Sequence, residues 1–329
     1  MIATAFLFYR VLFSVIDFTE KPIFFEIKSG ETFSDVISNL DNLEFIDNNI
    51  LLKIYARLTN KGTKIRAGEY RFDGLTNLSL IIEKFISGAV FLHPLTIIEG
   101  SSEIDLRAEL KASSLFIDTA EDININWDKI SDGSFPPSSK ANIEGLFLPE
   151  TYLFARSTSI KTILQGAHNA LLVVLSEEWN DRAENLPLNS PYEGLILASI
   201  IEKETAVADE RSRIASVFIQ RLKLNMRLQT DPTVIYGLGS EFNGNLTRRD
   251  LRSDNPYNTY TRHGLPPSPI ALPGRDSIHA AFNPSNEDYI FFVASGDADG
   301  RHIFSKNIDD HNLAVKEYVN KIKAKEINK

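Results

Sequence analysis

Two glutamates, Glu202 and Glu204, lie two residues apart in the stretch Leu195-Ile-Leu-Ala-Ser-Ile-Ile-Glu-Lys-Glu-Thr205. In an α-helix, which turns by about 100° per residue, their side chains point about 200° apart and cannot face the same way. Glu204 occupies the last position of an apolar helical stripe, and Glu202 lies on a different face. The other members of that stripe are Leu197, Ile200 and Ile201.

This difference in helical face gives the two acids different expected chemistry. A carboxyl among apolar side chains loses hydration, which penalises its charged form and raises its pKa. A carboxyl that keeps its proton near neutral pH can act as a general acid. We therefore take Glu204 as the candidate catalytic acid and Glu202 as the fallback. A half-exposed acid that simply ends a helix would have the same pattern.

Two later segments could form a binding surface around such an acid. The segments 227–233 and 256–261 place amide, hydroxyl and aromatic side chains in chain that we predict to be non-helical. Such side chains line carbohydrate grooves, because sugar hydroxyls need hydrogen bonds and sugar faces need flat apolar contact. Ordinary turn chemistry is the alternative reading. The candidate substrate-binding residues are Gln229, Thr230, Asp231, Tyr257, Asn258, Thr259 and Tyr260.

Composition excludes several other chemistries. The chain has no cysteine, which removes disulfides, thiolate nucleophiles and cysteine zinc sites. Its six histidines have no metal-ligand spacing, and no GxSxG elbow or dinucleotide-binding glycine loop is present. We expect neither a metal nor a cofactor. The net charge of −9 argues against a nucleic-acid partner, which needs clustered Lys and Arg.

A second catalytic carboxylate is not obvious. Asp209 and Asp231 are the only acids near Glu204 in the sequence that could supply one. Asp209 fits better as an acid at the start of the next helix, and Asp231 as a loop-fixing acid before Pro232. Four histidines are predicted to have surface or packing roles: His263, His279, His302 and His311.

Periodicity and turn signals predict a mixed α+β fold. Ser190, Pro191 and Glu193 form a capping box that starts the helix carrying the two acids. Residues 225–244 are predicted to leave the helical pattern, and the proline-rich segment 255–274 to be irregular. A hairpin is expected at 289–304, where a glycine-bounded turn separates two apolar runs.

The N-terminal part predicts a small module of its own. Residues 24–72 follow the order strand, helix, helix, strand. Before them, residues 2–16 are mostly apolar but contain Arg10, and they are shorter than the roughly 20 residues that a membrane span needs. Residues 118–140 are rich in Asp, Asn, Ser and Pro and are predicted to form a loop or insertion.

Four segments of this chain resemble the YceG-like endolytic murein transglycosylases, the MltG family. Their order and spacing match the family, and the resemblance extends over nearly the whole chain from about Phe24. The segments are Ala198-Ser-Ile-Ile-Glu-Lys-Glu-Thr-Ala206, Arg227-Leu-Gln-Thr-Asp-Pro-Thr-Val-Ile-Tyr-Gly237, Tyr257-Asn-Thr-Tyr260 and Gly264-Leu-Pro-Pro267.

The resemblance implies three regions: a short membrane anchor at 1–20, a LysM-like βααβ subdomain at 21–92, and a mixed α/β lytic transglycosylase domain at 93–329. It implies a place in the inner membrane, with the catalytic domain facing the periplasm beside wall-synthesis enzymes. The implied substrate is the peptidoglycan glycan strand, cut internally to limit strand length. The family's catalytic glutamate maps onto Glu204.

Two alternatives remain at this stage. A hydrolytic muramidase would use Glu204 together with Asp231, because ordinary glycosidases need two carboxylates. A glycan-binding scaffold of the wall-synthesis machinery would bind strands without cleaving them. In a lytic reaction one acid suffices, because the C6 hydroxyl of the sugar itself attacks the anomeric carbon at high effective concentration.

Overall fold

The computed structural model describes residues 2–42, 49–116 and 143–327, and within it the chain divides into two compact units. The first unit comprises Met1–Leu95, Leu115–Asp118 and Leu153–Ser159. The second comprises Thr96–Ser114, Thr119–Tyr152 and Ile160–Lys329. Helices and small two-stranded sheets build both, so the fold is mixed α+β as predicted. The predicted insertion at 118–140 lies outside the described residues.

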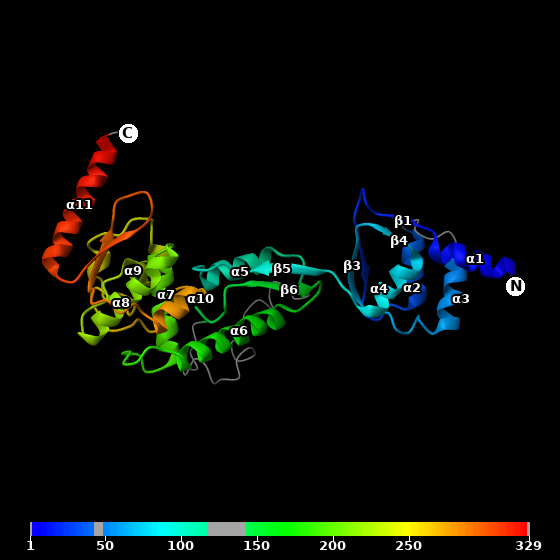
Figure 1. Ribbon diagram of the computed structural model, residues 1–329, viewed down its shortest axis with the longest axis horizontal. Coiled ribbons are helices and arrows are strands. Elements are labelled where there is room, and N and C mark those ends of the chain that lie inside the picture. The colour runs from blue at the N-terminus through cyan, green and yellow to red at the C-terminus, as the bar shows by residue number, and fades with distance from the viewer. Residues whose placement is uncertain (1, 43–48, 117–142, 328–329) are drawn as a thin grey trace. The chain divides into compact units, whose positions relative to one another are not determined.

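A βααβ arrangement forms most of the first unit (Figure 1). Its first and last strands pair antiparallel, with Ile23 opposite Phe72. The elements are β2 (Ile23–Ile27), α2 (Phe33–Asn42), α3 (Asn49–Thr59) and β3 (Gly68–Phe72). Around them lie α1 (Ile2–Phe13), β1 (Ile16–Asp17), β4 (Leu75–Thr76) and α4 (Leu78–Ser87). Alternation along β2 turns Phe25 and Ile27 into the core, where they meet the buried faces of the helices.

The second unit is mainly helical. It contains the antiparallel hairpin of β7 (Phe291–Ala294) and β8 (His302–Ser305). The other two strands, β5 (Leu92–Thr96) and β6 (Thr151–Ala155), pair with each other, and each has residues in both units. The helices of the second unit are α5 (Glu103–Ala112), α6 (Ile160–Asn180), α7 (Pro191–Glu204), α8 (Arg211–Lys223), α9 (Asp231–Leu238), α10 (Arg275–Phe282) and α11 (Ile308–Ile327). The short 3-10 turns are η2 (Ala208–Glu210), η3 (Gly239–Glu241) and η4 (Asp250–Arg252).

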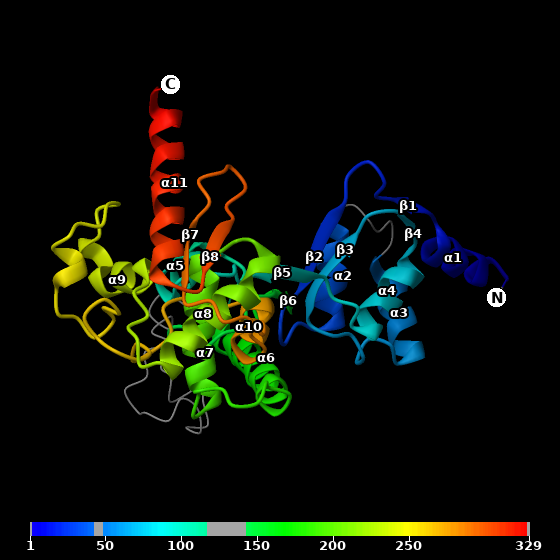
Figure 2. The ribbon, with the colours of Figure 1, turned by 60° about the vertical axis from the view of Figure 1, so that its left-hand side comes forward.

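Helix α7 is the centre of the second unit, where α6, α8, α9 and α10 all pack against it (Figure 2). Every residue from Gly194 to Ile201 is buried. A Cβ atom added at Gly194 would lie 2.1 Å from a ring carbon of Phe282, so only glycine allows α10 to come this close. The sequence predicted one apolar stripe, but the structure buries all sides of this helix. Position on the helix therefore does not distinguish Glu202 from Glu204.

The predicted start of α7 is confirmed with one difference. The hydroxyl of Ser190 accepts the Glu193 N–H at 3.3 Å, and Pro191 takes the first helical position. The Glu193 carboxylate, however, accepts the N–H of Asn189 at 2.8 Å instead of the Ser190 N–H that a capping box would use. The helix ends at Glu204, because Thr205 has extended backbone angles.

One prediction about the backbone was wrong. Residues 225–244 were expected to be non-helical, but Asp231–Leu238 forms α9. Thr230 is the N-cap residue, and Pro232 lies in the first turn, where a helix lacks hydrogen-bond partners for its N–H groups. Asp231 was predicted to fix a loop before Pro232, although an Asp-Pro pair also starts helices. The candidate residues of this segment are therefore held by a helix end.

The strand, helix, helix, strand order of residues 24–72, the helical start at Asp209, the hairpin and the irregular course of 255–274 are confirmed. Among the described residues, no helix combines the length and the apolar character needed to cross a membrane.

Candidate active site

Glu204 is the last residue of α7 and is partly exposed, and its carboxyl meets the start of α9. The hydroxyl of Thr230, the N-cap residue of α9, donates a hydrogen bond to Oε1 of Glu204. Thr230 itself is buried, with 2% of its surface exposed, so its hydroxyl has little freedom to turn elsewhere. The end of one helix and the start of another therefore fix the orientation of this acid.

Opposing effects set the proton affinity of Glu204. Burial raises the pKa of its carboxyl above the ordinary glutamate range, and the nearby charge of Asp231 adds to the rise. The hydrogen bond from Thr230 and the charges of His302 and Arg221 lower this pKa. The rise prevails, and the C-terminal end of a helix dipole also disfavours a negative charge. Glu204 has the properties of a proton donor.

Glu202 has a structural role in the same helix end. Its Oε2 accepts the backbone N–H of Gly274 at 3.0 Å, and its Oε1 lies 3.8 Å from a guanidinium nitrogen of Arg211. The side chain is only 7% exposed. These contacts join α7 to the starts of α8 and α10. The carboxyl of the fallback acid, Glu202, is therefore occupied by contacts within the fold, whereas Glu204 faces the predicted binding segments.

Two buried hydroxyls, those of Thr233 and Thr259, hold the start of α9 in place. The N–H of Thr230 donates to Oγ1 of Thr259 at 3.1 Å, and Oγ1 of Thr233 lies 2.8 Å from the same atom. The hydroxyl of Thr233 also donates to the Thr230 carbonyl at 2.8 Å. Thr259 is 2% exposed. We assign Thr259 to holding Thr230 in place, a different role from the strand contact predicted for it.

Asn258 is also turned inward. Its amide nitrogen donates to the carbonyls of Asp250 and Ser253 at 3.1 and 2.8 Å, and its amide oxygen accepts the N–H of Tyr260 at 2.9 Å. Only 1% of its surface is exposed. As with Thr259, this geometry assigns Asn258 to shaping the loop and leaves none of its polar atoms for a direct strand contact.

The other predicted residues can reach a ligand. Gln229 is exposed and has a φ of +50°, a left-handed backbone conformation that is uncommon outside glycine and concentrates at functional sites. Tyr260 is partly exposed, and its hydroxyl donates to Oδ1 of exposed Asp231 at 2.6 Å. Burial, followed by this hydrogen bond, raises the pKa of Tyr260. The partly exposed ring of Tyr257 is held by a 2.7 Å hydrogen bond between its hydroxyl and Ser268.

Sequence reasoning missed two basic residues beside this acid. Arg221 is buried in α8 and donates to the carbonyls of Leu228 and Ile290 at 2.6 and 2.8 Å. It thereby holds the segment that leads into Thr230, and burial lowers its pKa. His302, predicted as a surface or packing histidine, lies on β8, and its Nδ1 is 3.0 Å from Oε2 of buried Glu210. Neither role could be predicted from the sequence, because both residues reach the site through tertiary contacts.

Hydrogen bonds join the start of β8 to the segment that follows Glu204. The guanidinium of Arg301 donates two hydrogen bonds to Asp209, at 2.9 and 3.2 Å, and the N–H of His302 donates to Glu210 at 3.0 Å. Asp209 lies in the helical turn that the sequence predicted for it. It is exposed and paired with Arg301, so it is not the second acid of the site.

Within the described ranges, no group of three or more His, Asp or Glu side chains could hold a metal ion. The assembled groups are one acid of raised pKa, an exposed amide, a tyrosine–aspartate pair and an aromatic ring. This arrangement can protonate a leaving group and bind a polyhydroxylated ligand.

Comparison with known proteins identifies the family. Residues 25–317 match the YceG-like family. This chain belongs to the YceG-like family. The matched residues lie in both units and include every candidate site residue.

Among YceG-like relatives, the endolytic murein transglycosylase of Bacillus subtilis is 31% identical, over 97% of this chain and 91% of the relative. The endolytic murein transglycosylase of Streptococcus pneumoniae is 25% identical, over 92% of this chain and 59% of that longer protein. A solved YceG-like protein from Listeria monocytogenes is 29% identical, with a TM-score of 0.55 over 89% of this chain and 99% of the solved chain.

The hydroxyl of Thr230 should control the proton affinity of Glu204. A hydrogen bond to the charged carboxylate lowers its pKa, so Thr230→Val should raise the pKa of Glu204 further. Carbon-13 NMR titration of labelled glutamate side chains would measure the change, with Glu204→Gln to assign the resonance. Thr230→Ser keeps a hydroxyl and should titrate like the unmodified protein. An unchanged or lower pKa in Thr230→Val would contradict the assignment.

Proposed function

We propose that this chain is an endolytic peptidoglycan transglycosylase that cleaves the β-1,4 bond following MurNAc inside nascent glycan strands. The observation that carries the proposal is Glu204, an acid of raised pKa that lies beside exposed hydrogen-bonding and aromatic groups in a YceG-like chain. Relatives of this chain are named endolytic murein transglycosylases. Cleavage would leave 1,6-anhydroMurNAc ends and limit strand length.

In the proposed reaction, Glu204 acts twice. Its carboxyl first gives its proton to the glycosidic oxygen, and the bond between that oxygen and the anomeric carbon of MurNAc breaks. The C6 hydroxyl of the same sugar then bonds to the anomeric carbon, and its proton passes to the Glu204 carboxylate. The acid is regenerated, and no water is consumed. Because the nucleophile is intramolecular, its effective concentration is high.

The electrostatics around Glu204 suit both steps. Burial favours the protonated acid that the first step needs. The Thr230 hydroxyl and the charges of His302 and Arg221 stabilise the carboxylate that the first step leaves behind. Gln229, Asp231 and Tyr260 would bind sugar hydroxyls, and Tyr257 would offer its ring to a sugar face.

Glu204→Gln should fold normally and should release anhydro-ended fragments from purified murein about 10²- to 10⁴-fold more slowly. The amide keeps the shape of the side chain but supplies no proton. Glu202→Gln is the matched control: it should lower stability by about 1 to 3 kcal/mol, through its weakened contacts with Gly274 and Arg211, and keep turnover. If Glu202→Gln lost turnover while Glu204→Gln kept it, the assignment of the acid would be wrong.

The same digests separate the two alternatives. A muramidase that uses Asp231 with Glu204 would give reducing ends, whereas the lytic reaction gives anhydro ends. Mass spectrometry of the fragments distinguishes these products by one water molecule. A glycan-binding scaffold would give strand binding with no fragments at all.

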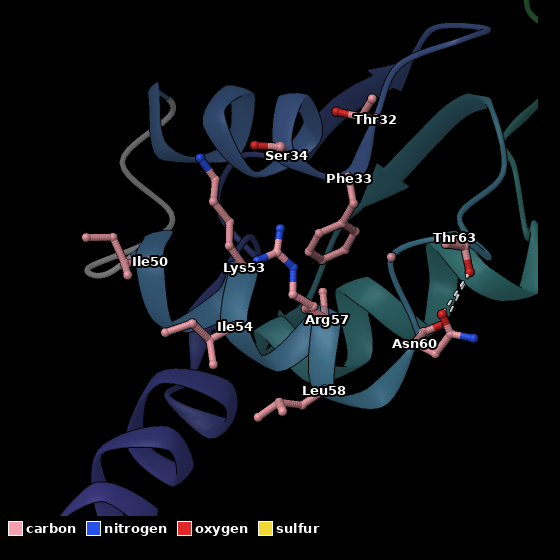
Figure 3. Close-up of a pocket in the computed structure, with 12 residues that line it drawn as sticks. Thr32, Phe33, Ser34, Ile50, Lys53, Ile54, Arg57, Leu58, Asn60 and Thr63 are labelled. Atoms are coloured by element: carbon pink, nitrogen blue, oxygen red, sulfur yellow. Dashed lines mark hydrogen bonds between the residues drawn. The ribbon is translucent and has the colours of Figure 1, made fainter.

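We also propose that the βααβ arrangement of the first unit is a LysM-like glycan-binding module. Its antiparallel β2–β3 pair and the two helices between those strands support this reading. A groove of about 690 Å³ opens between the start of α2 and the exposed side of α3 (Figure 3). Phe33 supplies an aromatic surface in it, and Asn60 and Thr63 supply polar groups, while the cations Lys53 and Arg57 suit the carboxylates of muramyl substituents.

Replacing both groove cations, by Lys53→Ala with Arg57→Ala, should weaken strand binding several-fold in a full-length Glu204→Gln background that cannot turn over. Affinity for purified murein strands would be measured by sedimentation at two salt concentrations. The control, Lys21→Ala with Lys28→Ala, removes the same charge from exposed positions of this unit outside the groove. Equal affinity in both double variants would refute the role of the groove.

We further propose that α1 holds the protein at the inner membrane, with the second unit in the periplasm beside wall-synthesis enzymes. The support is an apolar helix whose aromatic side chains are exposed: Phe6 63%, Tyr9 63% and Phe13 47%.

Replacing these three residues by serine should move the protein from the membrane to the soluble fraction of lysed cells. Protease added to spheroplasts should digest the second unit. Full protection from that protease would contradict the proposed location.

A further inference from the structure

Glu144 is a buried carboxyl that the proposed reaction does not use. It opens the apolar segment 144–154 and is only 3% exposed. The backbone around it is fixed: the N–H of Leu148 donates to the Ala167 carbonyl at 3.2 Å, and the Leu146 carbonyl lies 2.9 Å from Nδ1 of His168. Glu144 therefore projects from a rigid frame.

The partners of Glu144 come from different parts of the second unit. Its Oε1 accepts the N–H of Glu103, the first residue of α5, at 2.9 Å. The N–H of Gly145 and the side chain of Tyr236 also hydrogen-bond the carboxyl, and Tyr236 lies on α9. Burial raises the pKa of Glu144 to about 7. A buried acid that joins two helices in this way constrains where they lie.

Tyr236 connects this carboxyl to the binding surface. Its ring packs edge-on against the ring of Tyr257, with centroids 4.9 Å apart. The side chain of Asn255 joins the same two segments, because its nitrogen donates to the Gly237 carbonyl and its oxygen accepts the Tyr257 N–H, each at 2.9 Å. Tyr236 also lies on the helix whose N-cap, Thr230, orients Glu204.

We propose that Glu144 is a positioning residue for glycan binding: through Tyr236 it fixes the Tyr257 ring against which a sugar face stacks, without touching the strand itself. The inference rests on the proposed function and extends it to a residue outside the binding segments. A buried acid that only stabilised the fold would have no selective effect on strand affinity. Glu144 and Tyr236 should instead act on affinity as one unit.

The test is a double-mutant cycle of Glu144→Gln and Tyr236→Phe in the full-length Glu204→Gln protein. Affinity for peptide-free murein strands should fall about tenfold in each variant, which is the size of effect expected when one buried hydrogen bond is lost. The variant with both changes should bind no more weakly than either one, because the two residues share one interaction. In the active protein, the same changes should raise KM with kcat nearly unchanged.

Glu69→Gln is the matched control. Glu69 is 5% exposed and hydrogen-bonded to His93 and Arg156, but it belongs to the first unit and contacts none of the site residues named above. It should lower the melting temperature and leave strand affinity unchanged. If Glu144→Gln does not fold, Tyr236→Phe alone decides: an unchanged affinity refutes the proposal, and a tenfold loss supports it.

Other outcomes also decide. Fully additive losses, or a fall in kcat at constant KM, would overturn the positioning role. If the unmodified protein neither bound nor cleaved strands, the proposed function itself would fail. Normal binding and cleavage with no effect of Glu144→Gln or Tyr236→Phe would refute only this inference.

Discussion

The hydrogen bond between Thr230 and Glu204 is the contact on which the site depends. It joins the end of α7 to the start of α9, two helices brought together by the fold from different parts of the chain. Burial and the helix end favour a neutral carboxyl, while the Thr230 hydroxyl and the basic side chains of Arg221 and His302 favour a charged one. An acid that must first release and then recover a proton needs both influences. The buried hydroxyls of Thr233 and Thr259 serve to keep this contact in place.

The two glutamates of α7 differ in their partners more than in their helical faces. Residues 194–201 are buried on every side, so the helix is a rigid support and not an amphipathic one. Both acids emerge in its last turn. Glu202 contacts a backbone N–H and a guanidinium, and through them it holds the starts of α10 and α8 against α7. Glu204 meets a hydroxyl beside exposed side chains. Identical residue types thus acquire different chemistry from their surroundings.

The sequence predicted most elements of this fold, because caps and periodicity act locally. Ser190 and Pro191 marked the start of α7 correctly. Asp231 and Pro232 were misread, since the same pair serves turns and helix starts. Residue types also predicted which segments form the candidate binding surface around Glu204. They could not indicate that the amide of Asn258 faces inward, or that Arg221, His302 and Tyr236 lie near the site. Those facts depend on packing between segments far apart in the sequence.

The first unit is built from three separate stretches of chain, and this has an evolutionary consequence. Phe154 stacks on Phe116 with ring centroids 5.0 Å apart, and Arg156 donates to buried Glu69 at 3.1 Å. A recombination event that cut the gene after codon 95 would separate these partners and leave buried Glu69 with His93 but without Arg156. The two units therefore cannot be exchanged between proteins as independent domains. Substitutions in residues 153–159 should instead covary with substitutions in residues 1–95.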